Sequence, residues 1–167
     1  MGTRHHHAKP ISYSRKPPLR RGFSFARYHR TMATNLHISV LGRPSPQGSK
    51  KHVGGGRMIE ASKYLPAWRK AVCTAAVKAV QDELWAKLAG PVGLAVTFYL
   101  ERPTTIKPDK RPMPIKPPDL DKLVRGVCDA LSDAGVWEDD AQVVKLTAFK
   151  EYADTREPGC AIEVTIL

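Results

Sequence analysis

The stretch PDLDKLVRGVCDALSDAGVWEDDAQVV, residues 118–144, decides both the fold and the candidate chemistry. A helix is predicted from Leu120 to Asp133, and Gly135 follows just past its end, where helices often stop. Asp139-Asp140 are expected to form a turn, and Val143–Tyr152 is predicted to be a strand. The stretch therefore predicts a helix, a turn and a strand, with acidic residues before and after the helix.

The flanking sequence completes the predicted domain. Apolar spacing predicts a strand from Asn35, a helix from Leu65 to Leu88, a strand from Val92 to Leu100 and a strand from Ala161 to Leu167. Residues 42–57 and 102–118 are rich in Gly or Pro and are predicted to be loops. The order β-α-β-α-β-β predicts an α+β fold, a mixed sheet with two helices packed on one face.

The excess positive charge is confined to the N-terminal part of the chain. The formal net charge is +11, and residues 1–59 hold 12 of the 27 Lys and Arg but no acid, because the first acid is Glu60. We expect residues 1–33 to form a disordered basic tail or extension, followed by a folded domain over 34–167. A vector remnant, an extension upstream of Met32 and a targeting segment are the alternative origins of the tail.

Several protein classes do not fit this composition. No apolar run approaches the roughly 20 residues that span a bilayer, and no secretory signal is apparent. The three cysteines, Cys73, Cys128 and Cys160, are widely spaced and form no zinc-binding pattern. Reduced, buried thiols in a cytoplasmic protein are therefore expected.

One segment within the domain is basic. Residues 102–125 carry seven Lys and Arg against three acids. Such a stripe on the folded part of a chain is typical of phosphate binding, and an ordinary solvated loop is the alternative. The seven are Arg102, Lys107, Lys110, Arg111, Lys116, Lys122 and Arg125.

Three aspartates are the candidate metal ligands. Asp119 and Asp121 lie at the start of the predicted helix, where capping is the alternative role. The connection 134–138 is long enough to return beside the helix, so we expect Asp140 to converge with them. Two carboxylates about 4 Å apart repel by roughly 4 kcal/mol at an effective dielectric near 20, so such a cluster favours a cation. Oxygen ligands without His or Cys favour Mg²⁺ or Mn²⁺.

Two further residues of the helix have alternative roles. Asp121, Arg125 and Asp129 are spaced four residues apart, which predicts ion pairs along one helix face. Arg125 could instead stabilise charge on a phosphate that is being cut. Trp137 is expected in the core.

These residues resemble the RusA family of Holliday junction resolvases. The family pattern is Asp-x-Asp-Asn, a Lys on the next turn, Asp-Ala-Leu, and a final Asp-Asp-x-Gln. Here it corresponds to Asp119-Leu120-Asp121-Lys122-Leu123, Asp129-Ala130-Leu131 and residues 135–144. The strong match covers about 26 residues, and the order of elements fits over about 130.

The resemblance implies a homodimer that cuts four-way DNA junctions by paired symmetric nicks, leaving 5′-phosphate and 3′-hydroxyl ends. It implies that Asp119, Asp121 and Asp140 hold Mg²⁺, with Mn²⁺ as a substitute. The family's catalytic Lys falls on Arg125 and its Asn on Lys122. These are two departures, because Arg keeps the charge but not the easily shifted pKa of an ammonium group.

The remaining expectations concern DNA contacts and rival functions. Phosphate contacts are expected from the loop bases and Lys122, with strong salt dependence. These bases are Lys107, Lys110, Arg111, Lys116 and Lys122. A bacterial or phage-encoded protein acting on cytoplasmic, nucleoid DNA is expected. The rivals are a junction-binding protein with impaired catalysis, a carbohydrate-active Asp-x-Asp enzyme, and a structural protein whose carboxylates only cap helices.

Overall fold

The computed structural model describes residues 34–48, 50–52, 58–60 and 62–167. The predicted basic tail, residues 1–33, lies outside the described residues. The described elements are β1 (Asn35–Leu41), β2 (Lys50–His52), β3 (Met58–Glu60), α1 (Leu65–Asp82), β4 (Val92–Leu100), α2 (Leu120–Asp133), the 3-10 helix η1 (Asp140–Gln142), β5 (Val143–Tyr152) and β6 (Gly159–Ile166). Among them, no helix is long and apolar enough to cross a membrane.

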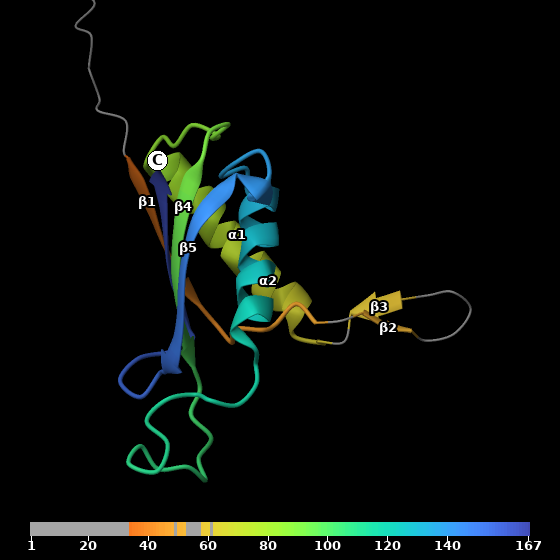
Figure 1. Cartoon of the computed structure of the whole chain (residues 1–167), viewed down its shortest axis with the longest axis vertical. Helices are drawn as coiled ribbons and strands as arrows, with labels where there is room; N and C mark the ends of the chain where they lie inside the picture. Colours follow the sequence, from red (N-terminus) through yellow and green to blue (C-terminus); the bar gives the residue numbers. More distant parts are fainter. Residues whose placement is uncertain (1–33, 49, 53–57, 61) are drawn as a thin grey trace, which may run out of the picture. The chain divides into compact units, whose positions relative to one another are not determined.

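Four strands form one mixed sheet in the order β1-β6-β4-β5. β4 and β5 are parallel, whereas β6 is antiparallel to both β1 and β4. Figure 1 shows α1 and α2 on the same face of this sheet. The predicted α+β fold, a mixed sheet with two helices on one face, is therefore confirmed.

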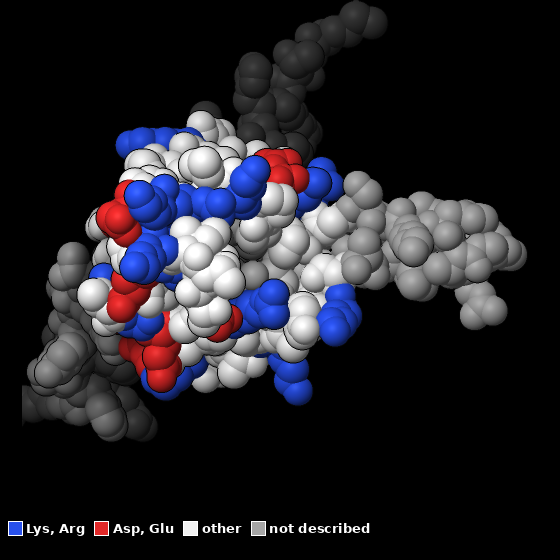
Figure 2. All heavy atoms as spheres, turned by 90° about the horizontal axis from the view of Figure 1, so that it is seen from below, with Lys and Arg blue, Asp and Glu red and all other residues white. Residues whose placement is uncertain are grey.

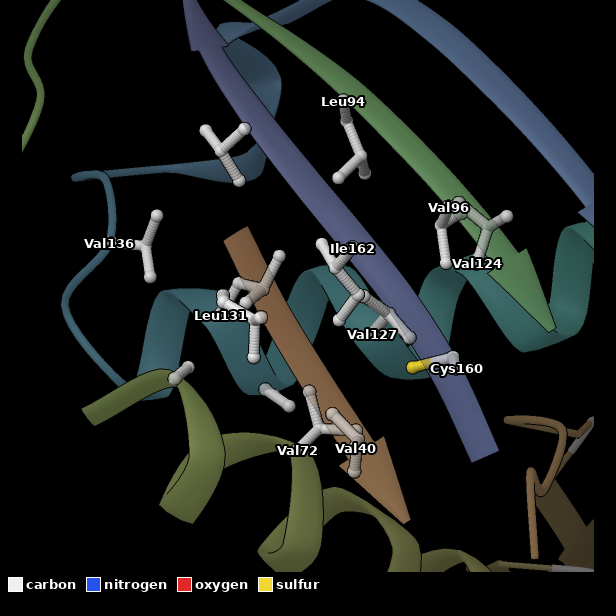
Figure 3. Packing of buried hydrophobic residues seen from close by; sticks show 14 of the residues in the cluster. Val40, Val72, Leu94, Val96, Val124, Val127, Leu131, Val136, Cys160 and Ile162 are labelled. Atoms are coloured by element: carbon white, nitrogen blue, oxygen red, sulfur yellow. The ribbon is translucent and has the colours of Figure 1, made fainter. Parts of the chain in front are cut away.

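The core lies between the sheet and the two helices. Alternate residues of β1 are buried, as expected for a strand with one face covered. On α2, buried residues recur at helical spacing, and each fully buried Leu or Val contributes roughly 1.5–3 kcal/mol. Figure 3 shows side chains of β1, β4 and β6 meeting those of the helices: Val40, Leu94, Val96, Cys160 and Ile162 with Val72, Val124, Val127 and Leu131. This packing fixes the position of α2 along the sheet.

Helix α1 ends at Asp82, six residues before the predicted end at Leu88. Leu84 adopts a left-handed backbone conformation with φ 50°, and the Trp85 amide donates a hydrogen bond to the Val80 carbonyl (2.9 Å). This is a helix-terminating turn of the Schellman type. It directs Trp85 into the core, where its indole Nε1 donates to the carbonyl oxygen of Val136 (3.2 Å).

The predicted loop over residues 42–57 contains a strand, so that prediction is wrong at Lys50–His52. This strand, β2, pairs antiparallel with β3 in a separate two-stranded sheet. Each strand has only three residues. A segment so short has no measurable alternation of apolar and polar residues, and the pattern could not reveal it.

Candidate active site

The first candidate ligand, Asp119, is the N-cap residue of α2, but its side chain makes no capping hydrogen bond. Its carboxylate instead accepts from the Lys122 ammonium group at 2.7 Å. That hydrogen bond and charge lower the pKa of Asp119, and Asp119 in turn raises the pKa of Lys122. The capping alternative therefore does not explain the Asp119 carboxylate, which stays exposed and ionised.

A second ammonium group reaches the same corner from β5. Lys150 donates hydrogen bonds to the carbonyl oxygens of Lys116 (3.1 Å) and Pro118 (2.9 Å), and its charge also lowers the pKa of Asp119. Lys150 thus holds the chain that leads into Asp119. Lys150 is not among the site residues predicted from the sequence. Its alternation with Ala148 along β5 could have placed it on the helix side of the sheet.

Asp121 and Arg125 are both exposed on α2. The predicted ion pairs from Asp121 through Arg125 to Asp129 are not formed, since Asp129 faces other elements. Its carboxylate accepts from Gln47 Nε2 (2.6 Å) and lies 3.5 Å from the Arg69 guanidinium of α1. Within the described ranges, Arg125 takes part in no ion pair, which leaves its charge available to a ligand.

In the Asp-Asp-x-Gln segment, some side chains have a structural role and one does not. Asp139 caps η1 by accepting from the Ala141 amide (2.8 Å), and Gln142 completes the capping box. The Gln142 side chain also donates to the carbonyl oxygens of Leu88 (3.1 Å) and Gly90 (2.7 Å), which ties η1 to the start of β4. Asp140 has neither role, and it is exposed. Of the two adjacent aspartates, Asp140 is therefore the one whose carboxylate is free of a capping role and stays a candidate ligand.

The three aspartates do not converge within one chain, contrary to the prediction. Asp140 lines a hollow with Asp129, Ser132 and Asp133, beside the C-terminal half of α2. Ten residues of helix, about 15 Å, separate Asp119 from Asp129. Within the described residues, no group of three His, Cys, Asp or Glu side chains could hold a metal ion.

A buried tryptophan explains why the chain does not return along the helix. Trp137 is fully buried, as predicted, and its indole donates to Ser132 Oγ (2.8 Å). Its backbone bridges to Leu88, whose carbonyl oxygen accepts from the Glu138 amide (3.1 Å). These contacts hold the turn, and with it Asp140, at the C-terminal end of α2.

The donor chemistry at the start of α2 fits a hard divalent cation. Asp119 and Asp121 supply carboxylate oxygens within one helical turn, and Mg²⁺ binds well to one or two carboxylates while keeping several waters. Lys122 and Lys150 lower the pKa of Asp119, and together with the positive end of the helix dipole they oppose an added cation. A further carboxylate would offset that opposition.

The predicted DNA-binding bases lie at this same end of the domain. Lys107 and Lys110 are exposed in the proline-rich loop, whereas Arg111 and Lys116 line a cavity beside it. The Lys122 ammonium group forms an ion pair with the Asp119 carboxylate. Figure 2, which views the domain from this end, shows blue Lys and Arg side chains spread over the surface with acidic groups among them. The basic segment therefore adjoins Asp119.

Comparison with known proteins decides the family. The family model described as Endodeoxyribonuclease RusA matches residues 42–166. The chain belongs to the RusA family. The uncharacterised protein YqaN of Bacillus subtilis (strain 168) is 28% identical over 133 residues, covering 71% of this chain and 89% of YqaN.

Membership of the RusA family gives the activity at a coarse level: an endodeoxyribonuclease acting on Holliday junctions. It removes the carbohydrate-active alternative. The two departures from the RusA pattern now have structural settings. Lys122, at the Asn position, is paired with Asp119, and Arg125, at the Lys position, is exposed one turn beyond Asp121.

Proposed function

We propose that this RusA-family chain is a Mg²⁺-dependent endonuclease that resolves four-way DNA junctions by paired symmetric nicks, in recombination and repair. The observation that carries the proposal is the start of α2. There Asp119, whose side chain caps nothing, and Asp121 are exposed within one turn and adjoin a basic loop. Such a site presents metal ligands and phosphate-binding groups to the same strand of DNA.

The residues have separate roles in this proposal. Asp119, Asp121 and Asp140 would hold Mg²⁺, or Mn²⁺ in its place, which supplies an activated water and offsets charge on the leaving oxygen. Lys150 keeps Asp119 in position through the two carbonyl groups before it. Arg125 stabilises negative charge developing on the phosphate. Because a guanidinium group does not lose its proton in proteins, Arg125 acts by charge and not by proton transfer.

We infer that the protein acts as a homodimer, because the candidate ligands lie toward opposite ends of α2. In a dimer whose two copies run antiparallel about a two-fold axis, the Asp140 end of α2 in one copy would lie beside the Asp119 end of α2 in the other. β5 supports such pairing. It is an edge strand with Val144 and Leu146 65% and 53% exposed. Two equivalent sites also suit a junction cut on two opposed strands.

The test uses a synthetic four-way junction with Mg²⁺. Asp119→Asn and Asp121→Asn should each reduce cleavage by about a hundredfold or more while binding is retained, because each removes a carboxylate of the metal site. Asp82→Asn, a matched change on α1, should cleave like the unaltered protein. Equal cleavage by the Asp121→Asn variant and the unaltered protein, or no cleavage by either, would contradict the proposed metal-dependent nuclease function.

A junction-binding protein with impaired catalysis is the second candidate. The observation that favours it is the Lys122–Asp119 ion pair, which uses one of the proposed metal ligands. This candidate predicts tight, salt-sensitive junction binding with intact strands in both Mg²⁺ and Mn²⁺. Nicking in either metal excludes it.

A further inference from the structure

A basic cavity lies at the loop end of the sheet. It has a volume of about 410 Å³ and is walled by the end of β4, the proline-rich loop and the segment after β1. Its basic side chains are Arg43, Arg102, Arg111 and Lys116, and Glu101 is the acidic residue in its wall. The balance of charge in the lining is positive, so the cavity favours an anion.

Arg102 builds this cavity and is not available to a ligand. Its guanidinium group donates to both carboxylate oxygens of Asp154 at 2.6 Å and to the carbonyl oxygen of Arg111 at 2.6 Å. It also stacks on the Tyr152 ring, 3.8 Å from the centroid. Arg102 thereby fastens the loop to the β5–β6 turn, and its charge is balanced by Asp154. The other cations of the lining are Arg111, Lys116 and Arg43, and the Arg43 guanidinium group stacks on the Tyr64 ring, 4.5 Å from its centroid, without a carboxylate to balance its charge in the described residues.

The cavity adjoins the chain segment that leads into the candidate active site. Lys116, Pro117 and Pro118 form part of its wall, and Asp119 is the next residue. Lys150 fixes this short segment through the carbonyl oxygens of Lys116 and Pro118. An anion held in the cavity would therefore sit at a set place relative to the Asp119 carboxylate.

We propose that the cavity binds one backbone phosphate of the junction DNA, close to the phosphodiester bond that is cut. Arg43, Arg111 and Lys116 are its ligands. Guanidinium groups bind phosphate oxygens through paired, charge-assisted hydrogen bonds. Phosphate contacts set the register of a protein on DNA, so this one would align the neighbouring bond with Asp119 and Asp121. The inference rests on the proposed nuclease function and adds Arg43, which lies outside the basic segment 102–125.

The test compares Arg43→Gln, Arg111→Gln and the double variant with Lys87→Gln, the same change of charge at the opposite end of the domain. Junction affinity is measured by fluorescence anisotropy without divalent metal, and cleavage is measured with Mg²⁺. Each arginine variant should weaken binding and lower the slope of log affinity against log salt by about 1, and the double variant by about 2. Lys87→Gln should match the unaltered protein. Circular dichroism confirms that each variant is folded.

A second arm separates a defined pocket from diffuse attraction. Junctions carry a single neutral methylphosphonate, moved along the strand on either side of the cut. One position should cost the unaltered protein about tenfold in affinity, as expected for a lost charged hydrogen bond, and should cost the double variant nothing more. Equal loss at every position overturns the pocket. An unaltered protein that cuts junctions while the double variant behaves like Lys87→Gln overturns this inference alone, whereas no binding or cutting by the unaltered protein overturns both proposals.

Discussion

Lys122 stands where the RusA pattern has an asparagine, and its ammonium group lies 2.7 Å from the Asp119 carboxylate. An amide in that position would carry no charge. The ammonium group both occupies a carboxylate oxygen and repels a second cation. Both side chains of the ion pair are about half exposed, so water screens the attraction and the repulsion, and both are small.

Replacing Lys122 by Asn should therefore improve metal binding. The Mg²⁺ concentration for half-maximal binding should fall about two- to fivefold, a range that matches an exposed ion pair. Isothermal titration of Mg²⁺ or Mn²⁺ into the protein measures it directly, independently of cleavage. Lys87→Asn is the matched control. Unchanged or weaker binding by the Lys122→Asn variant would show that Lys122 does not compete at this site.

The cysteines provide a pH-dependent prediction. Burial raises the pKa of the Cys160 thiol to about 12, and burial together with Asp140 and Asp129 raises that of Cys128 to about 11. The reactive thiolate is therefore nearly absent at pH 8, at about one part in a thousand or less.

A folded Cys73→Ser variant should thus show no fast-reacting thiol toward a disulfide reagent at pH 8. Reaction should speed up as the pH rises toward 11. In guanidinium chloride at pH 8 both thiols should react at once. Rapid reaction of either thiol in the folded variant would contradict the raised pKa values.

At the scale of elements, the end of α1 carries identifiable strain. Leu84 has φ 50°, a conformation that costs a residue with a Cβ roughly 1–2 kcal/mol, and its side chain is 63% exposed, so it contributes little to the core. Leu84→Gly should stabilise the protein by about 1 kcal/mol, as measured by urea unfolding. Leu84→Ala keeps the Cβ and should give no such gain. Equal effects of the two changes would show that strain is not relieved.

The elements that could be predicted from the sequence are those with a long apolar period. β1, β4 and α2 begin within a residue of their predicted starts because each buries one face in the core. The end of α1 was missed because it depends on Trp85 reaching Val136, a contact between residues 51 positions apart. No local pattern encodes such a contact.

The candidate site shows the same division. Proximity of Asp119 and Asp121 follows from their spacing on one helix. Alternation with Ala148 along β5 indicates the face of the sheet on which Lys150 lies, but its place beside Asp119 depends on the pairing of β4 with β5. The position of Asp140 depends on the burial of Trp137, which holds the turn at one end of α2.

At the scale of the whole molecule, a mixing experiment tests whether two copies share a site. Asp121→Asn and Asp140→Asn should each be inactive alone. Mixed and allowed to exchange, they should regain nicking, because one of the two sites in each mixed dimer would hold only unaltered carboxylates. Random exchange of equal amounts restores about a quarter of the sites. Mixtures as inactive as the separate variants would show that each site lies within one chain.

The separation of Asp140 from Asp119 along α2 also has a consequence for the control of cleavage activity. A newly made copy that meets no other would hold two carboxylates among cations and would leave duplex DNA intact. Activity would then depend on dimerisation, and it would rise with the square of the protein concentration while that concentration is low. A stray single nick in a chromosome is the harm that such an arrangement avoids.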